Sequence, residues 1–193
     1  METTSFLLVG VGGQGTLLAS NIVAEVGLRA GYQVKKSEVH GMAQRGGSVS
    51  SHVRWGERVP SPLIGEGEVD ILVAFERVEA VRHVDALRPG GKVLVNDHAI
   101  VPMTVTAGSA TYPATDEILA ALRQATPDVT LVPGVRIAQE LGNARANNVV
   151  LLGVLSRWLD VEEAIWREVI ADRVPPRYKE LNLEAFTRGR SLT

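Results

Sequence analysis

The sequence has 193 residues, of which 45% are hydrophobic and 22% are charged, and these proportions are typical of a globular domain with its own core. Its formal net charge of −2 argues against a basic surface that would bind nucleic acid or an anionic membrane. It contains no cysteine, which excludes disulfides, a thiol nucleophile and a cysteine-ligated iron–sulfur cluster within this chain.

The N-terminal residues have no positively charged segment before the first apolar run, and no apolar run is long enough to span a bilayer. We therefore expect a cytoplasmic protein without membrane contact. If the function involves electron transfer, the redox centre must lie on another chain.

The first elements in the chain are a predicted strand, a glycine turn and a helix. Apolar residues 6–9 precede the turn, and residues 16–30 follow it with apolar residues at four-residue spacing. Gly10, Gly12 and Gly15 match the G-x-G-x-x-G spacing of dinucleotide-binding folds, in which backbone N–H groups and a helix dipole face an anion. In the alternative interpretation, these glycines only permit a tight turn and close packing of helix on strand.

The predicted second strand, residues 32–37, bears on which dinucleotide the turn would serve. A nicotinamide cofactor needs an Asp or Glu at the end of this strand, about 20 residues after the turn, to bind the ribose. Lys35, Lys36 and Ser37 occupy this place, and Glu38 comes slightly late. An NADP-dependent reductase that uses the two lysines remains an alternative, although no catalytic pair completes a dehydrogenase.

A polar, glycine-rich loop is expected at residues 38–47. Gly46 and Gly47 leave room beside Arg45 for its guanidinium to bind phosphate or carboxylate with two hydrogen bonds. The carboxyl ends of neighbouring parallel strands share one edge, so this loop and the glycine turn are predicted to form one anion site. The competing interpretations are a structural hydrogen bond for His40 and an ion pair at a subunit interface for Arg45.

Strands and helices alternate along the rest of the chain. Strands are predicted at residues 48–55, 69–74, 92–96, 100–105, 110–112 and 129–132, and helices at 76–87, 116–124, 135–141, 149–159, 161–170 and 178–186. This order predicts a three-layer α/β sandwich with a Rossmann-like, mainly parallel sheet between helices on both faces. We expect one domain over residues 1–174, and a tail over residues 175–193 with a short amphipathic helix and a frayed end.

The sequence predicts neither a catalytic residue nor a metal site in this chain. His52, His83 and His98 lie in different elements, and no pair of histidines has metal-ligand spacing. The nucleophile elbow of hydrolases and the H-E-x-x-H motif are missing, and the glycine turn lacks the Walker lysine. By itself the chain lacks the parts of a complete enzyme.

Two segments together point to a family. Residues 10–15 (GVGGQG) and 38–49 (EVHGMAQRGGSV) resemble the gamma-type subunits and domains of 2-oxoacid:ferredoxin oxidoreductases, which act on acids such as pyruvate and 2-ketoisovalerate. The form HGMAQRGG at residues 40–47 looks most like that of the indolepyruvate:ferredoxin oxidoreductase beta subunits. The resemblance covers essentially the whole chain.

The resemblance implies an accessory subunit of a heteromeric enzyme. In this family, oxidative decarboxylation of a 2-oxoacid yields an acyl-CoA, carbon dioxide and reduced ferredoxin. Thiamine diphosphate and the [4Fe-4S] clusters lie on the partner alpha subunit, so this chain alone would bind no cofactor and would meet ferredoxin only within the complex. The gamma-type domain packs beside the thiamine site, and coenzyme A (CoA) is the co-substrate.

We therefore interpret the two segments as a wall of the partner's active site or as a site for a CoA phosphate. The candidate residues are Gly10, Gly12, Gly13, Gln14, Gly15, His40, Gln44, Arg45, Gly46 and Gly47. A non-catalytic assembly module, in which the glycine turn is structural and the Arg45 loop docks the partner, remains the other alternative. Without its partner the chain would expose an apolar interface, through which it can form a homodimer.

Overall fold

The computed structural model describes residues 3–40 and 47–192. Within these residues six strands form one sheet in the order β2-β3-β1-β4-β5-β6. The strands are β1 (Thr4–Val11), β2 (Gln33–His40), β3 (Ser48–Gly56), β4 (Val69–Ala74), β5 (Leu87–Asn96) and β6 (Val129–Val132). Neighbours β1, β4, β5 and β6 are parallel, whereas β3 runs antiparallel to both β1 and β2. The sheet is therefore mixed and mostly parallel.

The position of β3 corrects the expectation that the first two strands are neighbours. Strands β2 and β3 form an antiparallel pair from Gln33↔Gly56 to His40↔Val49, and β3 pairs with β1 on its other side. The predicted loop therefore starts too early, since Glu38, Val39 and His40 continue β2. Because β1 and β2 run in the same direction on either side of β3, their carboxyl ends still lie at one edge of the sheet.

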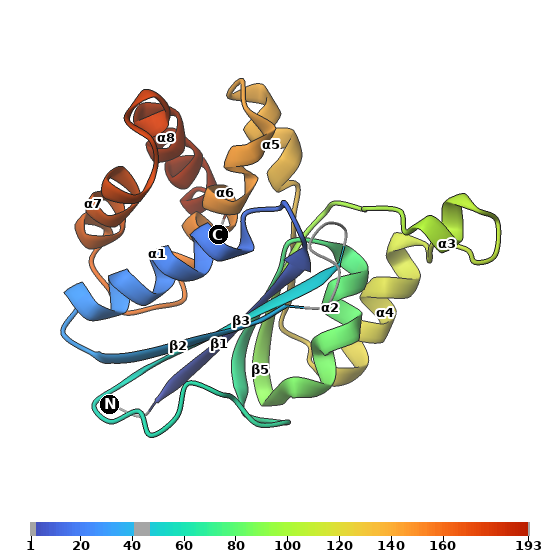
Figure 1. Cartoon of the computed structure of the whole chain (residues 1–193), viewed down its shortest axis with the longest axis horizontal. Coiled ribbons are helices and arrows are strands. Elements are labelled where there is room, and N and C mark those ends of the chain that lie inside the picture. The colour runs from blue at the N-terminus through green and yellow to red at the C-terminus, as the bar shows by residue number, and fades with distance from the viewer. Residues whose placement is uncertain (1–2, 41–46, 193) are drawn as a thin grey trace.

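Helices cover both faces of the sheet, which confirms the predicted three-layer α/β fold (Figure 1). One layer contains α1 (Thr16–Arg29), α5 (Gly134–Glu140), α6 (Asn147–Ser156), α7 (Glu163–Arg173) and α8 (Lys179–Arg190). The opposite layer contains α2 (Arg77–His83) and α4 (Thr115–Ala125). Short 3₁₀ helices occur at Val84–Ala86, Ala144–Ala146 and Pro176–Tyr178. No helix in the described ranges has the length and apolar character needed to cross a membrane.

Strand β1 is buried on both faces, as expected for the centre of such a sheet. Phe6 and Leu8 pack in the core under α1 and α6, whereas Leu7 and Val9 pack in the core under α2 and α4. Each core is therefore built from alternate residues of the same strand.

The C-terminal helix α8 is part of the larger core. Its Phe186 is fully buried and stacks on Trp166 of α7, with ring centroids 6.1 Å apart. The helix continues to Arg190, through residues that were expected to fray. Burial of the aromatic side chain supplies the packing energy that a solvated tail lacks.

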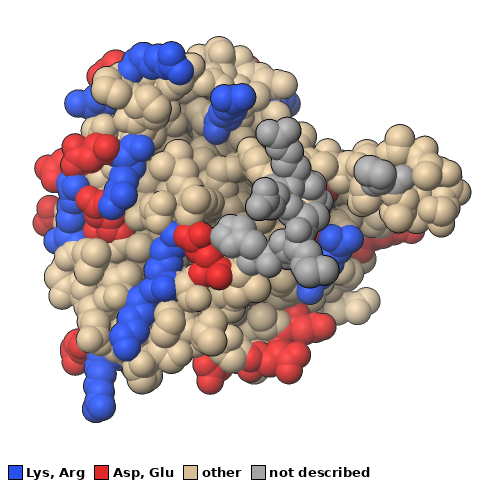
Figure 2. Space-filling view, in the orientation of Figure 1, with Lys and Arg blue, Asp and Glu red and all other residues tan. Residues whose placement is uncertain are grey.

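Residues 99–114, hereafter the arm, project from the body at the right of Figure 1. The two strands predicted at 100–105 and 110–112 are wrong, since the arm instead contains the short helix α3 (Met103–Thr106) and turns. Its β-branched residues have no neighbouring strand to pair with, and the Thr106 N–H and hydroxyl donate to the Pro102 carbonyl instead. Figure 2 shows that the projecting end carries neither blue nor red atoms on this face.

Candidate functional site

The glycine loop, residues 12–15, is fixed to the carboxyl edge of the sheet by the side chain of Gln14. Its Oε1 accepts a hydrogen bond from the Val11 N–H at 2.7 Å, and its Nε2 donates to the Phe75 carbonyl at 2.8 Å. Phe75 directly follows β4, so one amide ties the loop to the ends of two parallel strands. Both polar atoms of the Gln14 side chain make hydrogen bonds within the protein, so Gln14 has a structural role in holding the loop.

Gly15 needs to be glycine for two reasons. Its φ of 81° lies in the left-handed region, and an added Cβ would come within 2.4 Å of the Asn148 Nδ2. Asn148, at the start of α6, donates from this nitrogen to the Gly15 carbonyl at 3.3 Å. Helix α6 is therefore joined to the loop that begins α1.

Gly10, by contrast, lies in β1, where an added Cβ would come within 2.8 Å of the Gln14 Oε1. The missing side chain at Gly10 therefore leaves the space that the Gln14 amide occupies.

The structure brings part of the second predicted segment to the same place. The Gly12 N–H donates to the Gly47 carbonyl at 3.0 Å, and Ser48 pairs with Val11 in the sheet. His40 is the last residue of β2, at the same edge. Gln44, Arg45 and Gly46 lie outside the described residues, so their predicted part in the site stays a prediction.

The N-terminus of α1 also lies in this region. Gly15 is its N-cap residue, and no side chain of the described residues caps the helix. The first N–H groups of a helix have no partner within it and carry the positive end of its dipole. Thr16 is 4% exposed, and its hydroxyl is buried without a hydrogen-bond partner in the described part of the chain. It lines a hollow of about 380 Å3 beside Gly12 and Gly13.

A larger cavity of about 610 Å3 opens on the other side of the glycine loop. Cavities that hold small molecules are typically roughly 300–1,000 Å3. Helices α1 and α6 both begin at its wall, and none of the described residues that line it is Asp or Glu. Its lining consists of Gly12, Gly13, Gln14, Gly15, Leu18, His98, Ile100, Val135, Gln139, Ala144, Arg145, Asn147 and Asn148.

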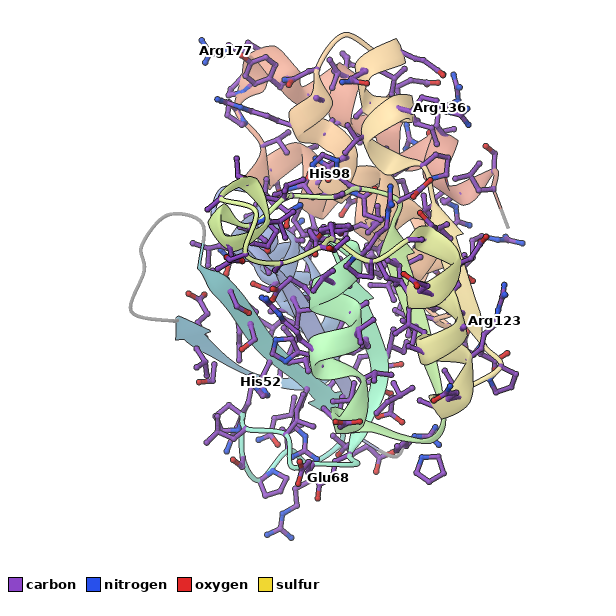
Figure 3. All side chains as sticks on the ribbon, turned by 90° about the vertical axis from the view of Figure 1, so that its right-hand side faces the viewer. His52, Glu68, His98, Arg123, Arg136 and Arg177 are labelled. Atoms are coloured by element: carbon purple, nitrogen blue, oxygen red, sulfur yellow. The ribbon has the colours of Figure 1, made fainter. Side chains whose placement is uncertain are left out.

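Among the described residues that line this cavity, the basic side chains are those of Arg145 and His98. Arg145 is exposed, and no ion pair joins its guanidinium to any described residue. Figure 3 shows His98 at the upper end of the sheet beside the arm, whereas Glu68 lies at the opposite end. A guanidinium and a helix N-terminus around one cavity favour a negatively charged ligand.

Hydrogen bonds of Asn96, Asn147 and Asn148 fix one wall of the cavity. The Asn96 Nδ2 donates to the Asn147 Oδ1 at 3.2 Å, and the Asn96 Oδ1 accepts from the Gly134 N–H at 3.1 Å. Asn147 also donates to the Ala144 carbonyl at 2.8 Å. Together with Asn148, these bonds connect β5, α5, α6 and the glycine loop, so the cavity is shaped before any ligand binds.

Sequence reasoning missed Arg145 and Gln139 and did not include His98 among the candidate site residues. The signals available were small: Asn147 and Asn148 stand directly before the most apolar helix, and His98 follows a predicted strand. Arg145 had no signal of its own, because its position beside the glycine loop depends on how α5 and α6 pack.

The two lysines that an NADP-dependent reductase would use are engaged elsewhere. The Lys36 Nζ donates to the Asn21 Oδ1 and the Glu38 Oε1, each at 2.5 Å. The Lys35 Nζ donates to the Pro60 carbonyl at 2.8 Å. Neither Lys35 nor Lys36 lines the cavity of about 610 Å3 or the hollow of about 380 Å3.

Comparison with known proteins identifies the family. Residues 5–192 match the family described as "Pyruvate ferredoxin/flavodoxin oxidoreductase". The chain belongs to this family. Among curated relatives, the indolepyruvate oxidoreductase subunit IorB of Archaeoglobus fulgidus is 43% identical over 187 residues, which cover 96% of this chain and 92% of that protein. The resemblance inferred from residues 10–15 and 38–49 is thereby confirmed.

Solved structures confirm the fold. The gamma subunit of a keto/oxoacid ferredoxin oxidoreductase from Geobacter sulfurreducens has a TM-score of 0.72 at 24% identity, with 97% of this chain and 96% of that chain covered. The 2-oxoglutarate:ferredoxin oxidoreductase of Magnetococcus marinus, solved with 2-oxoglutarate, coenzyme A and succinyl-CoA bound, has a TM-score of 0.75 at 22% identity. This alignment covers all of the present chain but 31% of that chain, so there the same fold is one part of a longer polypeptide.

Proposed function

We propose that this chain is the accessory subunit of an indolepyruvate:ferredoxin oxidoreductase and holds a phosphate-bearing part of CoA at the glycine loop. The observation that carries the proposal is the cavity of about 610 Å3, where the glycine loop, the N-terminus of α1 and Arg145 meet and no described lining residue is a carboxylate. The substrate assignment rests on the relationship to subunit IorB.

The division of labour follows from what this sequence contains. Iron–sulfur clusters are held by cysteine thiolates, and the sequence has none. The complex as a whole converts an aryl 2-oxoacid and CoA to an acyl-CoA and carbon dioxide, and two electrons reduce ferredoxin. We assign thiamine diphosphate, the clusters and the contact with ferredoxin to the partner subunit, and to this chain the binding and orientation of CoA.

The geometry fits a phosphate or diphosphate better than an uncharged ligand. Free N–H groups at the start of α1 donate to phosphate oxygens, and the Arg145 guanidinium can add a bidentate contact. The Asn147 and Asn148 side chains bond to the backbone and fix the walls. A related structure supports CoA as the ligand, since the 2-oxoglutarate:ferredoxin oxidoreductase of Magnetococcus marinus was solved with CoA and succinyl-CoA bound.

The test is Arg145→Ala in the complex with its native partner subunit. A charge-assisted hydrogen bond contributes about 1.5–3 kcal/mol, so the KM for CoA should rise roughly 10- to 150-fold while the KM for indolepyruvate stays unchanged. Arg123→Ala is the matched control, because Arg123 is exposed on α4 and lies away from His98 in Figure 3. An unchanged KM for CoA in an intact complex would contradict the CoA site.

The same experiment separates an assembly module from a ligand site. If the residues at the cavity only docked the partner, Arg145→Ala would weaken assembly and leave the KM for CoA of the remaining complex unchanged. Size-exclusion chromatography of the complex gives the first quantity, and steady-state kinetics at saturating indolepyruvate gives the second.

A further inference from the structure

The arm, residues 99–114, has an unusual surface for its exposure. Most of its residues from 101 onward are exposed, and Val101 is 52% exposed. It contains no Asp, Glu, Lys, Arg or His, whereas 22% of the whole chain is charged. Its projecting end in Figure 2 is the part of this face that stands farthest from the body and shows no charged atoms. The cores of protein interfaces are depleted of charged residues, so this exposed, uncharged projection has the composition of a surface that a partner covers.

The arm is held in one shape by its own hydrogen bonds. The Ser109 N–H and hydroxyl both donate to the Thr104 carbonyl, at 2.9 and 2.8 Å. The Thr106 hydroxyl donates to the Pro102 carbonyl at 3.2 Å. These hydroxyls therefore have partners before any contact forms, so burying them costs less free energy than burying free ones. A preformed segment also loses little conformational entropy on binding.

One buried carboxylate clamps both roots of the arm. The Glu76 Oε1 accepts the Ile100 N–H at 3.2 Å and the Tyr112 hydroxyl, while its Oε2 accepts N–H groups at the start of α2. Glu76 is 2% exposed. Burial, together with the bond to Glu76, raises the pKa of the Tyr112 phenol, so the phenol stays a donor. Glu76 thus fixes both ends of the arm to the N-terminus of α2.

The root of the arm also belongs to the cavity. Ile100 of the arm and His98, two residues before it, both line the cavity, so a subunit that covers the cavity also contacts the arm. The curated relatives are named as subunits of oxidoreductases, so such a complex offers a different chain, rather than a second copy of this one, to cover the arm.

We propose that the arm inserts into an uncharged, apolar recess of the partner oxidoreductase subunit and fixes the position of that subunit over the cavity. This inference rests on the proposed function for the identity of the partner. The exposed side chains along the arm are small and uncharged, and include the hydroxyl-bearing Thr104 and Thr111, so the recess must lack charged groups and closely fit the backbone. The apolar and small residues offered to it are Val101, Ala107, Ala110, Pro113 and Ala114.

The test compares carboxylates placed on and off the arm. Val101→Glu and Ala110→Glu are each introduced into this chain, and their affinity for the partner subunit that copurifies with the wild type is measured by surface plasmon resonance. Burying an unpaired carboxylate in an apolar recess is costly, so we expect the Kd to rise at least tenfold in both variants. Leu28→Glu is the matched control, since Leu28 is 58% exposed on α1, and its Kd should stay within twofold of the wild type.

A conservative variant and a second measurement keep the outcome interpretable. Val101→Thr, which keeps the shape without a charge, should retain the wild-type Kd. An unchanged Kd in both arm variants would overturn the inference. It would also be overturned if these variants altered only self-association of the isolated chain in sedimentation equilibrium, which would assign the arm to a second copy. The proposed function is judged separately, by the CoA- and indolepyruvate-dependent reduction of ferredoxin in the wild-type complex.

Discussion

Replacing Gln14 by Glu tests whether this residue is a clamp of the glycine loop. The substitution keeps the oxygen that accepts the Val11 N–H but turns the donor that faces the Phe75 carbonyl into a second acceptor. The lost bond costs about 1 kcal/mol and the unfavourable contact of two acceptors about 1–3 kcal/mol. The dipole of α1 returns about 0.5 kcal/mol to the new charge. The net loss at pH 8 is therefore roughly 1.5–3.5 kcal/mol, or a fall in Tm of about 3–14 °C.

The loss should depend on pH in a defined direction. Once protonated, the introduced carboxyl can donate to the Phe75 carbonyl, so its pKa in the folded state is raised above its ordinary value. The folded state then holds a proton that the unfolded chain has released, and the stabilising contribution is present at low pH and lost as the pH rises. At about pH 5 the deficit should shrink to under about 1 kcal/mol.

Thermal and urea denaturation of Gln14→Glu at the two pH values measure this difference. Gln139→Glu is the matched control, because Gln139 is exposed, lines the same cavity and makes no side-chain hydrogen bond to a described residue. It should change stability by less than about 0.5 kcal/mol at both pH values. An equal loss at both values, or none at pH 8, would refute the assignment of Gln14 as a clamp.

Two further predictions concern the packing and the pH dependence of the wild type. Gly189→Ala places a Cβ 2.0 Å from the Val150 carbonyl oxygen, so the overpacking outweighs the gain of about 1 kcal/mol in helix propensity. Urea denaturation should show that the free energy of unfolding falls by roughly 1–3 kcal/mol. The control Glu184→Ala, at an exposed position of the same helix, should lower it by less than about 0.5 kcal/mol. Burial lowers the pKa of His52 and His83 from 6.5, so below this pH the unfolded chain binds more protons and stability falls. The double variant His52→Gln, His83→Gln should show a shallower fall between about pH 7 and 5, and an unchanged slope would contradict this origin.

The elements that the sequence predicted well are those whose burial pattern is local. The apolar run at 6–9 predicts β1, the four-residue spacing after it predicts α1, and the uninterrupted apolar stretch from 149 predicts the buried helix α6. These patterns work because burial repeats with the period of the element itself. The arm shows the limit of the same reasoning, since its β-branched residues predict strands but have no sheet edge to pair with.

The candidate site was predicted in part for the same reason. The glycine turn was located by its spacing, and the carboxyl ends of β1 and β2 do share one edge. Insertion of β3 between them was not encoded locally, because antiparallel pairing with both neighbours depends on residues on three separate strands. The role of Gln14 was equally hidden, since one of its two partners, the Phe75 carbonyl, belongs to a distant strand end.

The sequence by itself determined the class of fold, the position of the glycine loop and, through its lack of cysteine, that no cysteine-ligated redox centre belongs to this chain. These conclusions need only periodicity, spacing and composition. Only the tertiary structure decided which groups surround the loop: Arg145 comes from the 3₁₀ helix before α6, Asn148 from the first turn of α6, and His98 from the segment after β5. Hydrogen bonds and packing between elements fix such neighbours, and those depend on residues far apart in the chain.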